Sequence, residues 1–303
     1  MASITLAEAS KLGLDDLTAG VIENIVTVDA LYSVLPFQPI NGNALTYNRE
    51  NALGDAQVLG IDGTITAKSA ATFTKVTSSL TTIIGDAEVN GLIQAQNVGG
   101  NAGNDVVAVQ IASKAKSIAR TYQNLFINGD ANNANEFNGL IHLVSAGQTI
   151  AGGSAALDFG MLDELIQSVK TKGSQVDFIA MPAKGLRKVA ALLRALGGST
   201  ADYVEINGVR VLHYNGVPIL RNDWIPTTLG VGGDESLVFA GNWDDGSQSV
   251  GIAGLTSAQN MGIHVQGVGP SETKDNEIYR VKFYSGLANY SNLGLAAINA
   301  VKF

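Results

Sequence analysis

The chain has 303 residues, of which 46% are hydrophobic and 15% charged, and its formal net charge is -8. This apolar content is enough for a sizeable core and excludes an intrinsically disordered chain. The negative charge, with no dense cluster of Lys and Arg, argues against a protein that reads nucleic acid. The absence of cysteine excludes disulfides, thiolate metal sites and a cysteine nucleophile.

The N-terminal stretch MASITLAEASKLGLDD, residues 1–16, has acidic residues and no continuous apolar stretch, so we do not expect a signal peptide. No window of the chain is apolar for long enough to span a membrane, and we expect no membrane partner. Residues 17–34 carry apolar side chains at helical spacing. This helix is expected to pack on the rest of the chain or on a neighbouring subunit.

Residues 36–70 are polar and rich in turn formers, with strands expected at 44–49 and 63–68. A weakly apolar excursion of this length is unusual inside a compact domain unless it is functional. We therefore interpret it as an arm that leaves the body. The Thr-rich, β-branched residues 71–84 predict a strand, and residues 86–94 a short helix.

Residues 105–127 carry the clearest helical pattern. Asn104 is the expected cap, Asp105 suits the positive end of the helix, and Gly129 suits its end. One face of the helix is formed by apolar residues spaced three or four apart, namely Val107, Ile111, Ala115, Ile118, Tyr122 and Leu125.

The second half of the chain mixes helices and strands. Helices are expected after Asp158, over 159–172, and after Pro182, over 183–196, with a buried strand at 178–181 between them. Further strands are expected over 203–220 as an antiparallel meander turning at Asn207-Gly208 and Asn215-Gly216, and at 236–243, 277–284 and 295–303.

No catalytic signature is present. The chain lacks a Gly-Lys dipeptide, the GxGxxG spacing, HExxH and GxSxG. His142, His213 and His264 lack ligand spacing and lie in strand-like runs, which favours structural positions. We therefore expect no catalytic residue, no cofactor-binding residue and no metal-binding residue.

The acidic clusters have simpler interpretations than a site. Asp163 and Glu164 are adjacent on a helix and point to different sides, so they are solvated charges rather than an acid/base pair. Residues 244–246, Asp-Asp-Gly, and Asp234-Glu235 can contact a cation, but polar turns are favoured because no EF-hand spacing follows.

Residues 127–144, INGDANNANEFNGLIHLV, follow the long helix. Their Asn, Gly and Asp residues suit turns, although the oxygens of Asp130, Asn132, Asn133 and Glu136 also suit calcium. Gly129-Asp130 followed by Gly139-Leu140-Ile141 resembles the HK97-like major capsid proteins of tailed bacteriophages, in which a long spine helix ends in such a turn. Ala131 replaces the second glycine of that turn.

Other segments resemble the same family in the same order, and together they cover most of residues 80–303. They are FIAMPAKGLRKVAALLRALGG, VLHYNGVPILRNDWIP with its Gly216, Val217, Pro218, Ile219 and Asp223, SLVFAGNWDDG, in which Asn242-Trp243 departs from the family pattern, and IYRVKFYSGLANYSNLGLAAINAV.

The resemblance implies an α+β, HK97-like capsid fold. Residues 1–42 would be the N-terminal arm, and residues 43–75 the E-loop, a β-hairpin reaching over a neighbouring subunit. Residues 76–145 and 261–303 would form the peripheral (P) domain with the spine helix. Residues 146–260 would form the axial (A) domain, and residues 127–144 the connector between spine helix and axial domain.

The implied function is structural and not enzymatic. Copies would assemble into pentamers and hexamers of an icosahedral head shell that encloses double-stranded DNA, located in the virion and, during assembly, in the host cytoplasm. A separate scaffolding protein or prior cleavage, cement or decoration proteins, and portal proteins are the implied partners. Packaged DNA would lie near the acidic wall by non-specific proximity.

Two alternatives stay open. The same fold serves encapsulins, the shells of bacterial nanocompartments, and a soluble α+β enzyme would need a deep pocket with converging polar groups. Some members of the capsid family join the E-loop to a neighbour through Lys–Asn cross-links. Lys68 and Lys75 lie in or beside this loop, but lysine is also an ordinary guard of edge strands, which we favour.

Overall fold

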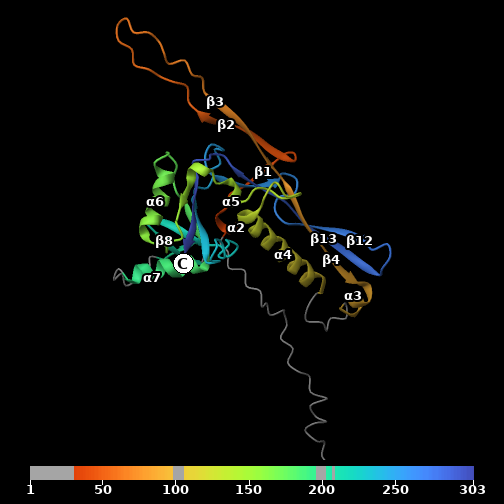
Figure 1. Cartoon of the computed structure of the whole chain (residues 1–303). Coiled ribbons are helices and arrows are strands. Elements are labelled where there is room, and N and C mark those ends of the chain that lie inside the picture. The colour runs from red at the N-terminus through yellow and green to blue at the C-terminus, as the bar shows by residue number, and fades with distance from the viewer. Residues whose placement is uncertain (1–30, 98–105, 196–202, 207–208) are drawn as a thin grey trace, which may run out of the picture.

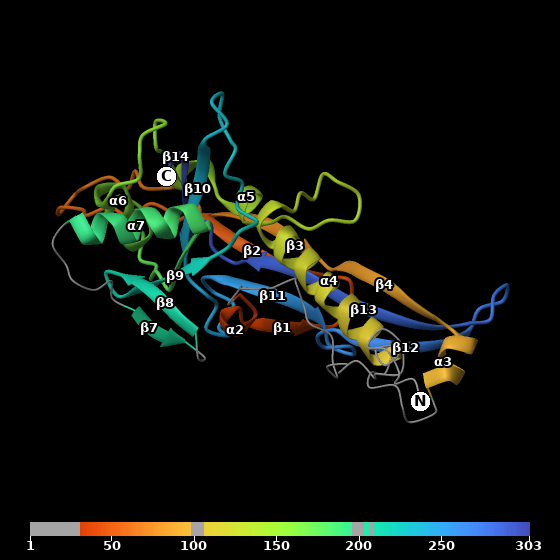
Figure 2. The same ribbon diagram turned by 90° about the horizontal axis from the view of Figure 1, so that it is seen from below.

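The computed structural model describes residues 31–97, 106–195, 203–206 and 209–303. Two sheets with covering helices form the body, and a β-hairpin projects from it (Figure 1). In both views α4 (Val106–Asn128) lies alongside one end of the molecule, while α6 (Phe159–Lys170) and α7 (Ala183–Ala195) lie at the other (Figure 2). No helix in this part of the chain is long and apolar enough to cross a membrane.

The first sheet is organised around one long strand, β13 (Asn276–Asn289). One half of β13 lies between β12 and β4, and the other half pairs with β11; β1 extends the sheet in parallel with β11. Cross-strand partners Asp86 and Arg280 form an ion pair of 2.8 Å that joins β4 to β13. The other strands are β1 (Phe37–Ile40), β4 (Thr81–Asn90), β11 (Ile252–Ser257) and β12 (His264–Pro270).

Helix α4 packs on this sheet and confirms the helix expected over 105–127. Tyr122 is fully buried, and its ring lies 5.3 Å from Phe283 of β13 and 5.7 Å from Phe137. Ile118 and Tyr122 of the predicted face are buried, and Ile111, Ala115 and Leu125 pack against the same core. The expected cap, Asn104, and Asp105 lie outside the described residues.

The end of α4 requires glycine for a different reason from the expected one. The N–H of Gly129 donates to the carbonyl of Leu125, 2.9 Å away, and the carbonyl of Gly129 accepts from Gly139, 2.8 Å away. Gly129 is not among the residues with positive φ. Its backbone instead lies so close to the connector that a Cβ would be 2.3 Å from the carbonyl oxygen of Phe137.

The second sheet has seven strands in the order β5-β14-β10-β6-β9-β8-β7, with both parallel and antiparallel neighbours. Its members are β5 (Thr149–Ala151), β6 (Phe178–Met181), β7 (Tyr203–Ile206), β8 (Val209–Tyr214), β9 (Val217–Arg221), β10 (Glu235–Gly241) and β14 (Leu295–Lys302).

Both faces of the second sheet are buried, as alternation along its strands shows. In β6, Ile179 and Met181 pack with α6 and α7, whereas Phe178 and Ala180 pack in the core shared with α4 and the first sheet. The buried strand expected at 178–181 is thus confirmed. The two cores meet across this sheet, so the body is one packed unit.

In the second half of the chain, the expected cap of α6 and the expected turn at Asn215-Gly216 are confirmed. Asp158 caps α6 by accepting from the N–H of Met161, at 2.8 Å, although the helix ends at Lys170 rather than 172. Asn215 and Gly216 turn the meander with φ of 51° and 80°. The turn expected at Asn207-Gly208 lies outside the described residues, as do 17–30 of the helix expected over 17–34, of which α2 (Leu31–Val34) is described.

The strand expected over 71–84 is confirmed, although it is divided into two strands, β3 (Thr72–Ser79) and β4. The helix expected over 86–94 is wrong for its first half, because β4 continues to Asn90 and α3 (Gly91–Asn97) begins only after it. Val89 and other alternate residues of β4 are buried, because pairing with β13 overrides local helix preference.

The strand expected at 63–68 is also absent, since residues 53–71 contain no strand. The side-chain oxygen of Gln57 accepts from the backbone N–H groups of Thr66 and Ala67, at 2.7 and 2.8 Å, in place of a ladder. Short elements without a sequence signal include α5 (Leu140–Leu143) and the 3-10 helix η1 (Ala146–Gln148).

Replacing Gly129 with Ala should lower the free energy of unfolding by about 1–3 kcal/mol, because the new Cβ must displace backbone. The exposed Gly147 in η1 has nothing within 4 Å of its Cβ position, so Gly147→Ala is the matched control, with an effect within about 0.5 kcal/mol. Urea unfolding of the full chain measures both, and equal midpoints for the two variants would contradict the close-approach account.

Candidate functional site

The projecting hairpin is the most conspicuous surface feature. It consists of β2 (Ala44–Ala52), antiparallel to β3, and of the loop 53–71 that leads away from the body (Figure 1). A two-stranded hairpin is at best marginally stable by itself in water. Its loop and strands nevertheless expose large apolar side chains, namely Leu53, Val58, Leu59, Ile61, Ile65 and Phe73.

Exposed apolar side chains gathered on one projecting segment indicate an interaction surface. Val58 is 101% exposed and Ile61 is 95% exposed, so neither contacts the body of its own chain. Lys68 and Lys75 are also exposed on this hairpin. The surface therefore needs a second molecule to become buried.

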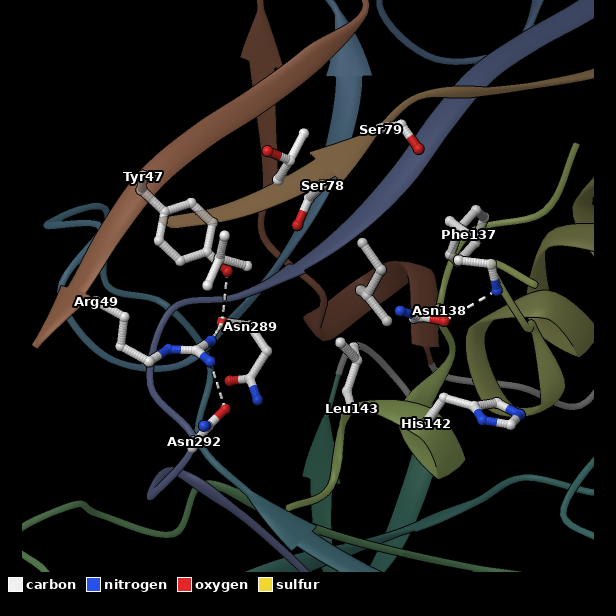
Figure 3. A pocket seen from close by; sticks show the side chains of 14 residues that line it. Tyr47, Arg49, Ser78, Ser79, Phe137, Asn138, His142, Leu143, Asn289 and Asn292 are labelled. Carbon is white, nitrogen blue, oxygen red and sulfur yellow. Dashed lines mark hydrogen bonds between the residues drawn. The ribbon is translucent and has the colours of Figure 1, made fainter. Parts of the chain in front are cut away.

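The root of the hairpin is fixed to the body by polar contacts (Figure 3). Arg49 donates to the carbonyl of Tyr290 at 3.0 Å, to Oδ1 of Asn292 at 2.6 Å and to the carbonyl of Asn289. The hydroxyl of Tyr47 donates to the same Asn289 carbonyl at 2.7 Å. The hairpin is thus attached where β13 ends.

Tyr47 and Arg49 form the anchor of the hairpin, and burial keeps the Tyr47 phenol neutral at neutral pH. Burial raises the pKa of Tyr47, and the positive charge of Arg49 offsets part of that rise. Burial also raises the pKa of Tyr290 to about 12, with a further rise from Asp244. The Tyr47 phenol therefore stays neutral and remains a hydrogen-bond donor.

A pocket of about 190 Å³ lies between this root and the body. It is lined by Tyr47, Arg49, residues 76–79 of β3, Ala131, Phe137, Asn138, His142, Leu143, Leu287, Asn289 and Asn292. None of these residues is Asp or Glu, so the described lining offers no carboxylate to act as a general acid or base.

The histidines lie on separate elements. His213 is on β8 and His264 on β12, in strands as expected, but His142 is in the short helix α5 and not in a strand. Among the described residues, no three His, Asp or Glu side chains are grouped closely enough to hold a metal ion.

The acidic residues serve local structure. Asp163 accepts from the hydroxyl of Tyr214 at 2.8 Å, which raises the pKa of Tyr214 in addition to the effect of burial. Asp234 pairs with Lys302 at 2.9 Å. Asp244, which is buried, accepts from the N–H of Gln248 at 3.0 Å.

Other acidic groups close turns. Oδ1 of Asp245 accepts from the N–H of Ser247 at 2.9 Å, and hydrogen bonds from Ser247 lower the pKa of Asp245. In the connector, Oδ1 of Asp130 accepts from the backbone and side chain of Asn132, at 2.9 and 2.8 Å. Glu136 accepts from the N–H of Asp130 at 3.2 Å. These oxygens hold the connector's own turns.

The anchor residues were not singled out from the sequence. Arg49 binds residues about 240 positions away, and no spacing pattern reports a contact of that range. The available signal was indirect. Tyr47 and Arg49 lie in a polar segment that has few apolar side chains with which to pack on the body.

The fold resembles known shells. One solved structure is the SrpI encapsulin complex from Synechococcus elongatus, with a TM-score of 0.73 and 21% identity, covering 100% of this chain and 97% of that chain. The capsid of a native GTA particle is similar with a TM-score of 0.68 and 12% identity, covering 99% of this chain and 100% of that chain. A structure from Microbacterium phage Oxtober96 is similar with a TM-score of 0.68 and 15% identity, covering 98% of this chain and 99% of that chain. At these identities the likeness establishes the HK97-like fold.

Sequence comparison establishes the family. No curated protein matches the chain. A family model described as the SU10 major capsid protein matches residues 26–237, which is more than half of the chain and includes the whole hairpin, the spine-like helix α4 and most of the second sheet. The chain therefore belongs to the SU10 major capsid protein family, and it is a shell subunit of a phage head.

Proposed function

We propose that copies of this chain form pentamers and hexamers of an icosahedral head that encloses double-stranded DNA of a tailed phage, and that each hairpin braces a neighbouring copy. The observation that carries this proposal is the exposed apolar surface of the loop 53–71 in a member of a capsid family. Burying that surface against identical neighbours supplies the same contact at every subunit.

The domain assignment is part of the proposal. Residues 1–42 act as the N-terminal arm and 43–75 as the E-loop. Residues 76–145 with 261–303 form the peripheral domain, and 146–260 the axial domain. The sheets support this division in outline, because β4, β12, β13 and α4 pack together, while α6, α7 and β6 to β10 form the other unit. Two strands cross between the units: β11 joins the first sheet and β14 the second.

The wider setting follows from the same role. A scaffolding protein directs assembly in the host cytoplasm, and portal and cement or decoration proteins complete the head. The subunit has no catalytic function, as its structural family suggests. The net charge of -8 lets packaged DNA lie near the wall without strong adhesion.

The encapsulin alternative is favoured by one observation, the SrpI encapsulin likeness at a TM-score of 0.73. Both kinds of shell use the same subunit fold, so the fold does not separate them. The contents of the particle do, because an encapsulin encloses a cargo protein and a phage head encloses DNA.

The full-length chain, produced with the neighbouring genes of its source, should form closed icosahedral particles by electron microscopy. These particles should contain double-stranded DNA when the packaging proteins are present. A cargo protein in place of DNA would support the encapsulin alternative. A stable 31.4 kDa monomer in size-exclusion chromatography would contradict both.

Replacing Leu53, Val58, Ile61 and Ile65 together with Ser should abolish closed shells but leave the subunit folded, since these side chains are exposed in the single chain. Circular dichroism measures folding and electron microscopy measures assembly. The control variant, Ala56→Ser with Thr64→Ser, changes exposed positions of the same loop and should assemble normally. Normal shells from the fourfold variant would show that the hairpin surface is not an assembly contact.

Arg49→Ala should loosen the hairpin root at a cost of about 1–2 kcal/mol, because three acceptors on the body lose a charged donor. Hydrogen exchange should rise along β2 and β3 while α6 stays protected. Arg187→Ala, on the exposed face of α7, is the control and should leave the exchange unchanged. Unchanged exchange at β2 in the Arg49 variant would refute the anchor.

A further inference from the structure

Asn289, at the end of β13, combines burial with unused hydrogen-bonding capacity. Its side chain is 1% exposed, yet neither the amide nitrogen nor the amide oxygen has a hydrogen-bond partner. Its backbone carbonyl, in contrast, accepts from both Tyr47 and Arg49. A buried donor and acceptor without partners destabilise the isolated subunit, and such groups in native proteins call for an explanation.

The same side chain lines the pocket at the hairpin root (Figure 3). The wall opposite the hairpin is formed by the connector and α5, through Asn138, His142 and Leu143. A volume of about 190 Å³ is far more than one water molecule needs, and it accommodates about six waters or a short piece of polypeptide.

The lining contains no carboxylate to attract a cationic ligand. Its one guanidinium, of Arg49, already donates from all three nitrogens to Tyr290, Asn292 and Asn289. A side-chain amide presents one donor and one acceptor side by side. This arrangement is complementary to the C=O and N–H groups of a polypeptide backbone.

We propose that this pocket receives a main-chain segment of a neighbouring copy of the chain, with the Asn289 nitrogen donating to a peptide carbonyl and its oxygen accepting from a peptide N–H. The inference rests on the proposed shell function. A second copy is the chosen occupant because the pocket is continuous with the hairpin, whose β3 residues 76–79 form one wall and whose apolar loop needs a neighbour.

Occupation of the pocket links assembly to the direction of the hairpin. The segment seated there contacts the hairpin root, the connector and the end of β13 at once. The anchor of Tyr47 and Arg49 lies on the same residue, Asn289, so a neighbour that engages its side chain also reinforces the attachment of the hairpin.

The test compares Asn289→Leu with Ser285→Ala. Ser285 lies on the same strand and is fully buried with an unpaired hydroxyl, but it does not line the pocket. Both variants should leave the melting temperature of dissociated subunits unchanged or higher, because each removes an unpaired polar group. Asn289→Leu alone should raise the subunit concentration needed for shells roughly tenfold, through loss of contacts between copies.

Equal assembly of Asn289→Leu and wild type would overturn this inference and leave the shell function standing. A wild-type chain that forms no shell would overturn both. Should Asn289→Leu fail to fold, Asn289→Ala and direct imaging of wild-type shells decide the question. Backbone of a neighbouring copy at hydrogen-bonding distance from the Asn289 amide supports the proposal, and ordered water alone in the pocket overturns it.

Discussion

A two-stranded hairpin cannot bury its own apolar side chains, and this constraint governs the structure. The loop 53–71 carries Val58 and Ile61 almost fully exposed, with no core of its own to receive them. Hydrophobic burial is the main favourable term in association. Under the proposed function, neighbouring copies cover this surface.

The long strand β13 connects the hairpin to the body. At its end, Asn289 accepts from Tyr47 and Arg49 of the hairpin. Along its length it pairs with β4, β11 and β12, and α4 covers it through Tyr122. The hairpin is thus connected to the body through hydrogen-bonded ladders and a packed core.

Sequence predicted those elements whose determinants are local. The cap Asp158, the apolar spacing of α4 and the Asn215-Gly216 turn each act within a few residues, and each was identified. It did not predict that β4 would replace a helix, because β13, almost 200 positions away, decides that strand. The interpretation of 36–70 as a departing arm came from the weak hydrophobic pattern of this segment, and the two-stranded sheet of β2 and β3 agrees with it.

The candidate site was the least predictable part. Arg49, Asn289 and Asn292 come together only in the folded chain, and an Asn without a hydrogen-bond partner has no signature in sequence. The family resemblance implied a role for the hairpin but did not identify the residues that attach it to the body. Long-range polar contacts of this kind are visible only once the strands are paired.

Hydrogen exchange of the loop 53–71, compared between dissociated subunits and assembled shells, tests the central claim most directly. The amides of this loop should exchange rapidly in the subunit and become strongly protected in the shell, while α6 is protected in both states. Equal exchange of the loop in both states would contradict the view that neighbouring copies cover the hairpin.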